Sequence, residues 1–142
     1  MDIKIFGRRM IELLPRFSRE LAQRESNYLS YGKITSPQLW ALEYLSKKKG
    51  CLMCEIADYL GVSRPAVTGL VDRLIHQKLA KRENVPHDRR EIKVCVTPKG
   101  KNLVVDILTQ RRRTFEKMFS RISPHERKVY LTILERVIDE IR

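Results

Sequence analysis

The first thirty residues carry apolar side chains at helical spacing. Residues three or four apart face the same side of a helix, so this spacing predicts an amphipathic helix from residue 3 to about residue 30. Pro15 lies inside the pattern. We expect either a kink there or a helix that starts there, because proline lacks the backbone donor of a helix interior. The stripe consists of Ile3, Phe6, Met10, Leu13, Leu14, Phe17 and Leu21.

Three later helices share a start signal, a hydroxyl residue directly before proline. We expect each hydroxyl to accept from a free amide of the first turn, while the proline loses no hydrogen bond. Glu126 completes a capping box at the third start. The starts are Ser36-Pro37, Thr97-Pro98 and Ser123-Pro124, and the first helix is expected to bury Leu39, Trp40, Leu42 and Leu45.

The chain ends in a continuous apolar stripe that needs a surface to pack on. The helix at the other end of the chain carries a similar stripe, and a two-fold dimer would cover both. An intramolecular helical hairpin is the alternative. The stripe near the C-terminus consists of Val129, Tyr130, Ile133, Leu134, Val137, Ile138 and Ile141.

The middle of the chain has the pattern of a helix-turn-helix. Residues 55–60 form a short helical pattern, Gly61 marks a turn, and a second helix is expected from Ser63 to about Gln77. The second helix is expected to bury Val67, Leu70, Val71, Leu74 and Ile75, and to turn Arg64, Pro65, Thr68, Asp72 and Arg73 outward.

Beyond residue 79 the pattern changes from helix to strand. Residues 80–83 and 91–96 are expected to pair around a loop at 84–90, in which Pro86 and Asp88 favour a turn. A helix, a turn, a second helix and a basic hairpin, in this order, are typical of a winged helix-turn-helix that binds duplex DNA. The predicted fold class is therefore mainly α with a small β-wing. In the second strand, Ile92, Val94 and Val96 alternate with Lys93 and Cys95, the pattern of a half-buried strand.

The charge of the chain favours a polyanionic partner. Lys and Arg outnumber Asp and Glu by 29 to 17, a net charge of +12. Nucleic acid is favoured over a membrane, and a merely basic protein is the alternative. No apolar run is long enough to span a bilayer, and the first residues lack a secretory signal. Three cysteines do not make a disulfide framework, so we expect a reduced, cytoplasmic protein.

The start of the second helix holds the candidates for base recognition, which are Arg64, Pro65, Ala66 and Thr68. Arginine can bind guanine through two hydrogen bonds, and small apolar groups suit the thymine methyl. A solvated face on a core helix is the alternative for this helix taken alone. The preceding helix and the turn at Gly61 favour the DNA interpretation.

With these motifs, the sequence strongly resembles the MarR family of bacterial transcription regulators over nearly its whole length. Its Asp-x-Arg signature at Asp88 and Arg90, followed by Thr97 and Gly100, is more specific than a generic helix-turn-helix. Further matching segments are Thr35-Ser36-Pro37-Gln38, Glu55-Ile56-Ala57, residues 60–68 and residues 71–74.

The resemblance implies a homodimer on double-stranded DNA with a pseudo-palindromic operator. It implies one domain over 1–142, with dimerisation helices at 1–34 and 101–142 and a winged helix-turn-helix at 35–100. The recognition helix 63–77 would enter the major groove and the wing 83–96 the minor groove. It implies major-groove contacts from Ser63, Arg64, Pro65, Ala66 and Thr68, a backbone contact from Arg73, and wing contacts ordered by Asp88 and made by Arg89 and Arg90.

The family also implies a site for a small lipophilic or phenolic effector between the dimer body and the DNA-binding region, and we expect a repressor that such an effector releases. Aromatic side chains of the first helices could line such a site, and each could equally be core. These candidates are Phe17, Tyr28, Tyr31 and Trp40.

Three positions depart from the family pattern. Lys78 stands where many members have glycine, which predicts either a left-handed residue or a different turn. Leu52 stands where a capping Ser or Thr is common, and Gly69 replaces a larger polar residue of some relatives. The operator sequence therefore cannot be copied from a relative.

Two other functions remain as alternatives. A thiol- or metal-responsive regulator could use Cys51 and Cys54, which form a CxxC motif that lacks further matched ligands. A non-specific architectural DNA-binding protein would share the charge and the helices. We expect no enzyme activity, no catalytic residues, no metal and no cofactor, since the chain lacks a phosphate loop and a nucleophile elbow.

Overall fold

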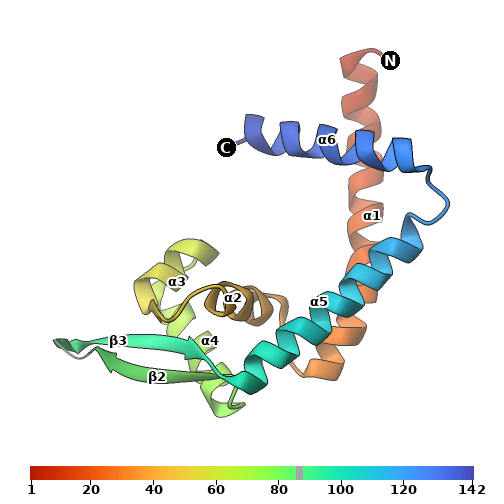
Figure 1. Cartoon of the computed structure of the whole chain (residues 1–142). Coiled ribbons are helices and arrows are strands. Elements are labelled where there is room, and N and C mark those ends of the chain that lie inside the picture. The colour runs from red at the N-terminus through yellow and green to blue at the C-terminus, as the bar shows by residue number, and fades with distance from the viewer. Residues whose placement is uncertain (86–87) are drawn as a thin grey trace. The chain divides into compact units, whose positions relative to one another are not determined.

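The computed structural model describes the backbone of residues 1–85 and 88–142, and the side chains of these residues other than 26–28, 30–32 and 88–91. The chain forms two compact units, Met1–Leu108 and Thr109–Arg142. Figure 1 shows the elements. They are α1 (Ile3–Gly32), α2 (Ser36–Ser46), β1 (Cys51–Leu52), α3 (Met53–Leu60), α4 (Arg64–His76), β2 (Ala80–Val85), β3 (Asp88–Val96), α5 (Pro98–Met118) and α6 (Pro124–Glu140).

Helix α1 is one continuous helix that passes through Pro15. The expectation of a helix over residues 3 to about 30 is confirmed, and the alternative of a helix that starts at Pro15 is wrong. A proline inside a helix removes one backbone hydrogen bond, and the neighbouring turns of this thirty-residue helix retain theirs.

Helix α2 begins one residue earlier than the sequence pattern predicted. Thr35 is the N-cap, and its Oγ1 accepts from the Gln38 amide at 3.4 Å. Gln38 Oε1 in turn accepts from the Thr35 amide at 3.0 Å. The expected cap, Ser36, is instead the first helical residue, because only a cap at Thr35 places Gln38 at the third helical position of a capping box.

The fully buried core of the first unit joins α2, α3, α4 and the sheet; these elements, residues 36–96, are called the reading head below. Each of these three helices, and strand β3, contributes apolar side chains that have no exposed surface. The first turns of α5 add Val104 and Ile107 to this core. Trp40 was expected on the buried side of α2 but is 48% exposed. The buried face of this helix is formed by other residues at helical spacing, Leu39, Leu42 and Leu45. The core residues of the reading head include Leu39, Leu42, Leu45, Ile56, Val67, Val71, Leu74 and Val94.

The sheet has the order β1-β3-β2, and both pairs are antiparallel. The hairpin strands are longer than predicted, since β2 reaches Val85 and β3 begins at Asp88. Strand β1 was not predicted; it pairs Cys51 with Val94. Two residues are too short for a periodic signal, and only their partner strand identifies them as a strand.

The predicted alternation along β3 is correct at Val94 and wrong at two positions. Ile92 is 39% exposed, whereas Cys95 is buried. Figure 1 shows the hairpin extending past the helices, so its outer part has no core to face. The Sγ atom of Cys95 lies 3.6 Å from the Lys49 carbonyl oxygen and 3.5 Å from Glu83 Oε2, near the base of the hairpin, so the thiol can donate its one proton to either acceptor.

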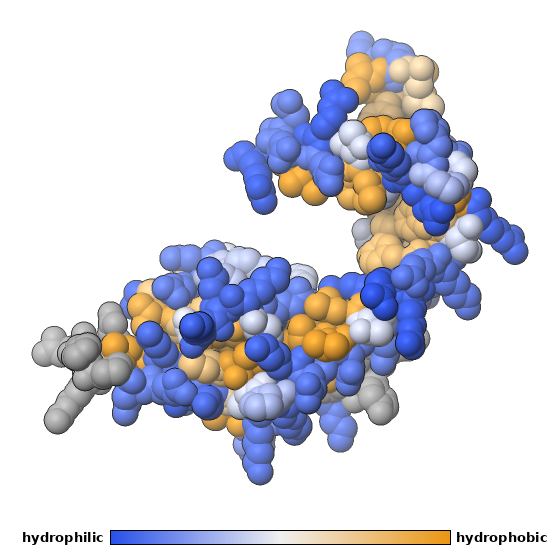
Figure 2. Space-filling view, in the orientation of Figure 1, coloured by the Kyte–Doolittle hydropathy of each residue, from blue (hydrophilic) through white to orange (hydrophobic). Residues whose placement is uncertain are grey.

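The second unit contains the end of α5 and the whole of α6. Ser123 caps α6 as predicted, with its Oγ accepting from the Glu126 amide at 3.2 Å and Glu126 Oε2 accepting from the Ser123 amide at 3.0 Å. No side chain of α6 is buried. Ile133 and Val137 are half exposed. Figure 2 shows apolar side chains open to the surface on both α1 and α6. In the described part of the chain, no helix is both long and apolar enough to cross a membrane.

Candidate nucleic-acid interface

The turn between α3 and α4 depends on Gly61. Its φ is +66°, a left-handed conformation that glycine adopts without a steric penalty. The Gly61 and Val62 amides donate to carbonyls of the last turn of α3, which ends that helix. At the other end of α3, Leu52 offers no side-chain cap, and Glu55 Oε2 accepts from the Leu52 amide at 3.1 Å instead.

Helix α4 has the orientation that the sequence predicted. Ser63 caps it through Oγ, which accepts from the Ala66 amide at 3.4 Å. Val67, Val71 and Leu74 lie fully in the core, which fixes the rotation of the helix about its axis. The opposite face is therefore open to solvent. Its exposed residues include Ser63, Arg64, Pro65, Ala66, Thr68, Asp72 and Arg73.

This exposed face also adjoins the start of α2. A shallow groove of about 590 Å³ runs between the two elements. It brings Pro65, Ala66 and Arg73 of the predicted DNA-contact set beside Thr35 and Pro37. The linear sequence does not reveal that the start of α2 borders this surface, because only the packing of α2 on α4 places it there.

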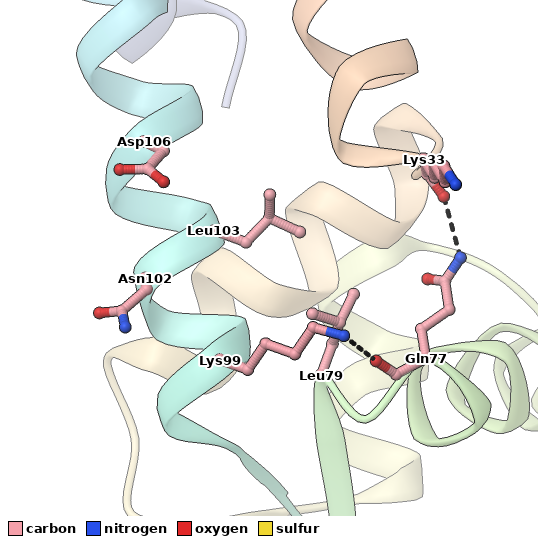
Figure 3. A pocket seen from close by; sticks show the side chains of 7 residues that line it. All are labelled: Lys33, Gln77, Leu79, Lys99, Asn102, Leu103 and Asp106. Atoms are coloured by element: carbon pink, nitrogen blue, oxygen red, sulfur yellow. Dashed lines mark hydrogen bonds between the residues drawn. The ribbon is translucent and has the colours of Figure 1, made fainter.

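The end of α4 is held by polar contacts from two other segments, the end of α1 and the start of α5. Lys78 has φ of +61°, so the left-handed alternative for this position is confirmed. Gln77 Nε2 donates to the Lys33 carbonyl at 2.9 Å, and Lys99 Nζ donates to the Gln77 carbonyl at 3.0 Å, as Figure 3 shows. Thr97 Oγ1 donates to the Lys78 carbonyl at 2.7 Å. The recognition helix is thus joined to the start of α5.

Gly100 allows the close approach of α5 to this turn. A Cβ atom added at Gly100 would lie 2.1 Å from the carbonyl oxygen of Leu79. A real Cβ never comes that near to an oxygen, so only glycine fits here without moving the backbone.

The wing is the β2–β3 hairpin. The signature residues Asp88, Arg89 and Arg90 lie on β3, and their side chains are outside the described part of the structure. The predicted loop at 84–90 is shorter than expected, since strand pairing continues to Val85 and Asp88.

An ion pair that the sequence did not reveal joins the wing to the recognition helix. Arg82 of β2 donates through Nη2 to Asp72 Oδ1 of α4. Ten residues and a turn separate the two, so no helical or strand spacing brings them together. Only the packing of β2 beside α4 does.

A pocket of about 670 Å³ lies beside the end of α4 (Figure 3). Phe17 and Trp40, two of the predicted effector residues, are not in its lining; the former is half-buried on α1 and the latter exposed on α2. The side chains of Tyr28 and Tyr31 are outside the described residues. The pocket is lined by Lys33, Gln77, Leu79, Lys99, Asn102, Leu103 and Asp106.

Cys51 of the CxxC motif is poorly suited to thiol sensing. All three cysteines are free thiols. Burial raises the pKa of the Cys51 thiol, and the nearby Glu55 carboxylate raises it further, which keeps the thiol protonated and unreactive. Among the described residues, no group of three His, Cys, Asp or Glu side chains could hold a metal ion.

Comparison with known proteins agrees with the fold and the motifs. A family model described as "MarR family" matches residues 33–91, which span most of the reading head. The matched region, residues 33–91, belongs to the MarR family of DNA-binding helix-turn-helix transcriptional regulators. The members of this family are transcriptional regulators and not enzymes.

Individual MarR-family relatives and structures extend this match beyond the reading head. The HTH-type transcriptional repressor MdtR of Bacillus subtilis is 30% identical over 93 residues, which cover 66% of this chain and 60% of MdtR. A MarR family protein from Bacillus stearothermophilus has the same fold, with a TM-score of 0.86 at 22% identity over 99% of both chains. A single-residue mutant of MepR from S. aureus, solved bound to an oligodeoxyribonucleotide, matches with a TM-score of 0.70 at 24% identity over 92% of this chain and 96% of that one.

Proposed function

We propose that this MarR-family protein is a sequence-specific repressor that binds a pseudo-palindromic operator as a homodimer. The observation that carries the proposal is the exposed face of α4, which presents Arg64, Pro65, Ala66 and Thr68 at the capped start of a helix whose other face is locked in the core. Two similar proteins support it: the MepR mutant was solved with an oligodeoxyribonucleotide, and MdtR is a repressor.

In the proposed complex, residues 63–77 lie in the major groove. The guanidinium of Arg64 would bind guanine O6 and N7, while Pro65 and Ala66 would contact a thymine methyl group. Ser63 and Thr68 offer hydroxyl groups to base edges, although the Thr68 proton is already donated to the Arg64 carbonyl at 3.0 Å. Arg73 would bind the phosphate backbone at the edge of the groove.

The wing, residues 83–96, would follow the minor groove beside the recognition helix. In this proposal Asp88 orders the hairpin end, and Arg89 and Arg90 contact the minor groove or the phosphates. Arginine suits this place because a narrow minor groove concentrates negative potential.

The exposed apolar stripes of α1 and α6 support the homodimer. Large contiguous apolar surfaces are rare on monomers and mark interaction sites. We propose that 1–34 and 101–142 form the dimer body and that 35–100 bind DNA. Val104 and Ile107 of α5 also pack in the core of the reading head. Helix α5 would therefore link the dimer body to the DNA-binding part both through the chain and through side-chain packing.

We also propose that a small lipophilic or phenolic effector releases the repressor. Phe17, Tyr28, Tyr31 and Trp40 remain the proposed contacts from the family pattern. The pocket beside Gln77 and Lys99 offers a second place, next to the end of the recognition helix. A ligand that binds one spacing of the two reading heads better than the other would shift the population by its differential affinity.

Selection of bound sequences from a random duplex pool at physiological salt tests the proposal. The expected result is an enriched pseudo-palindrome with half-sites about one helical turn apart, bound by a dimer in light scattering. True operators usually bind about 10³-fold or more tighter than other DNA. Tight binding without enrichment would instead support the non-specific architectural protein.

A further inference from the structure

The DNA-facing surface of the recognition helix carries a negative charge that works against its function. Arg64, Thr68 and Asp72 recur every four residues and lie on one exposed stripe of α4. A carboxylate on this stripe would repel the phosphates that Arg64 and Arg73 attract. Since protein–DNA affinity depends on the net charge brought to the phosphates, an unpaired Asp72 would weaken binding at every sequence.

The structure pairs this carboxylate with Arg82. The guanidinium extends from β2 to α4, and its Nη2 donates to Asp72 Oδ1. The side chain of Arg82 is 40% exposed and that of Asp72 54% exposed, so the pair lies at the surface, at the junction of recognition helix and wing.

We propose that Arg82 is a positioning residue for DNA binding, which neutralises the Asp72 carboxylate and holds it away from the phosphates. The inference rests on the proposed function, in which this face of α4 meets DNA. The pair contributes no net charge to the interface. Loss of Arg82 leaves a net charge of −1 there, and loss of the Asp72 charge leaves +1.

A purely mechanical role for the pair is less consistent with the structure. Exposed ion pairs contribute little to stability. Strand β2 is already held without Arg82, because it pairs with β3 from Ala80 opposite Val96 to Asn84 opposite Ile92. Ala80 itself is buried in the core at the start of the strand. The start of the wing is therefore held in the core without this pair, whereas the charge of the surface depends on it.

A double-mutant cycle on the full-length protein separates the two roles. Arg82→Ala, Asp72→Asn and the double variant are titrated with the operator found by selection, at several salt concentrations. We expect Asp72→Asn to bind most tightly, the wild type and the double variant to bind alike, and Arg82→Ala to bind about tenfold more weakly at low salt. The slope of log K against log salt should become shallower by about 0.9 in Arg82→Ala and steeper by about 0.9 in Asp72→Asn.

Other orders of affinity would overturn the inference. If all three variants bind equally weakly, the pair acts only as a tether. If the double variant binds as weakly as Arg82→Ala, Arg82 contacts the phosphates itself. Failure of the wild type to select any operator would instead count against the proposed function.

A second ion pair of the same kind provides the control. Arg9 and Glu12 of α1 are joined at 2.7 Å and are similarly exposed, on an element outside the proposed DNA surface. Because α1 lies in the proposed dimer body, the same cycle is measured here at a protein concentration where light scattering shows only dimers, and Arg9→Ala and Glu12→Gln should then leave the salt slope unchanged. Equal melting temperatures across all variants would show that the differences arise at the interface.

Discussion

The reading head and the terminal helix α6 use similar apolar patterns but reach opposite degrees of burial. Leu39, Leu42 and Leu45 of α2 have no exposed surface, whereas Ile133 of α6 is 52% exposed. In the reading head, three helices and a sheet cover one another's apolar faces. The stripe of α6 has no such cover within its own unit.

In the proposed homodimer, this difference separates a part that folds on its own contacts from a part that packs on the second subunit. Helix α6 has a complete capping box, so its backbone start is satisfied locally. Isolated helices of this length are nevertheless marginal in water, and most helical stability in proteins comes from packing of the apolar face. A second subunit would supply that packing. Five predictions test this contrast, in order of expected effect.

Deletion of residues 124–142 should convert the dimer to a monomer and leave the reading head folded. The deletion removes the exposed stripe but none of the buried residues of the core. Sedimentation velocity measures the first result, and amide exchange protection of α2 and α4 measures the second. A folded dimer that lacks these residues would exclude α6 from the interface.

Gly100→Ala should destabilise the reading head by about 1–3 kcal/mol, because its new Cβ would overlap the Leu79 carbonyl and force the backbone to move. The matched control is Gly69→Ala in α4, where a Cβ meets nothing within 4 Å. That change should raise the free energy of unfolding by about 0.5–1 kcal/mol, through the higher helix propensity of alanine. Urea denaturation of both variants gives the two values. Equal losses in the two variants would contradict the close approach at Gly100.

Arg90→Ala should weaken operator binding by about 1–3 kcal/mol while the dimer and its melting temperature stay unchanged. This result would assign DNA binding to the wing and dimerisation to the terminal helices. Fluorescence anisotropy with the selected operator measures the affinity. Unchanged affinity in a folded protein would remove Arg90 from the interface.

Arg64→Ala should relax discrimination at one base position of each half-site, by about 1–3 kcal/mol between the right and the wrong base. The measurement is a competition series with single-base operator variants. An equal loss of affinity for every sequence would make Arg64 a phosphate contact and not a base contact.

Lys78→Gly should stabilise the protein by about 0.5–1 kcal/mol, the smallest effect in the series. Lysine at φ of +61° carries a steric cost that glycine does not. A glycine at exposed Lys48, where no left-handed conformation occurs, serves as the control and should not stabilise. A loss of stability in Lys78→Gly would show that the lysine side chain contributes more than its backbone costs.

The sequence determined the local features of this protein. The caps at Ser63 and Ser123, the turn at Gly61 and the exposed face of α4 all follow from a few neighbouring residues. Hydrogen bonds to a helix start and a left-handed φ depend on residues within one turn, so a linear pattern is enough to predict them. The order of these elements also carried the resemblance to the MarR family, which the comparisons confirmed.

Only the tertiary structure decided which side chains meet over long separations. It exposed Trp40 and Ile92, buried Cys95, added strand β1, and joined Arg82 to Asp72. It also showed why position 100 is glycine, since the obstructing oxygen belongs to Leu79. Burial, strand pairing and ion pairing depend on the segment that lies opposite in space, and neither the spacing nor the composition of the chain specifies that segment.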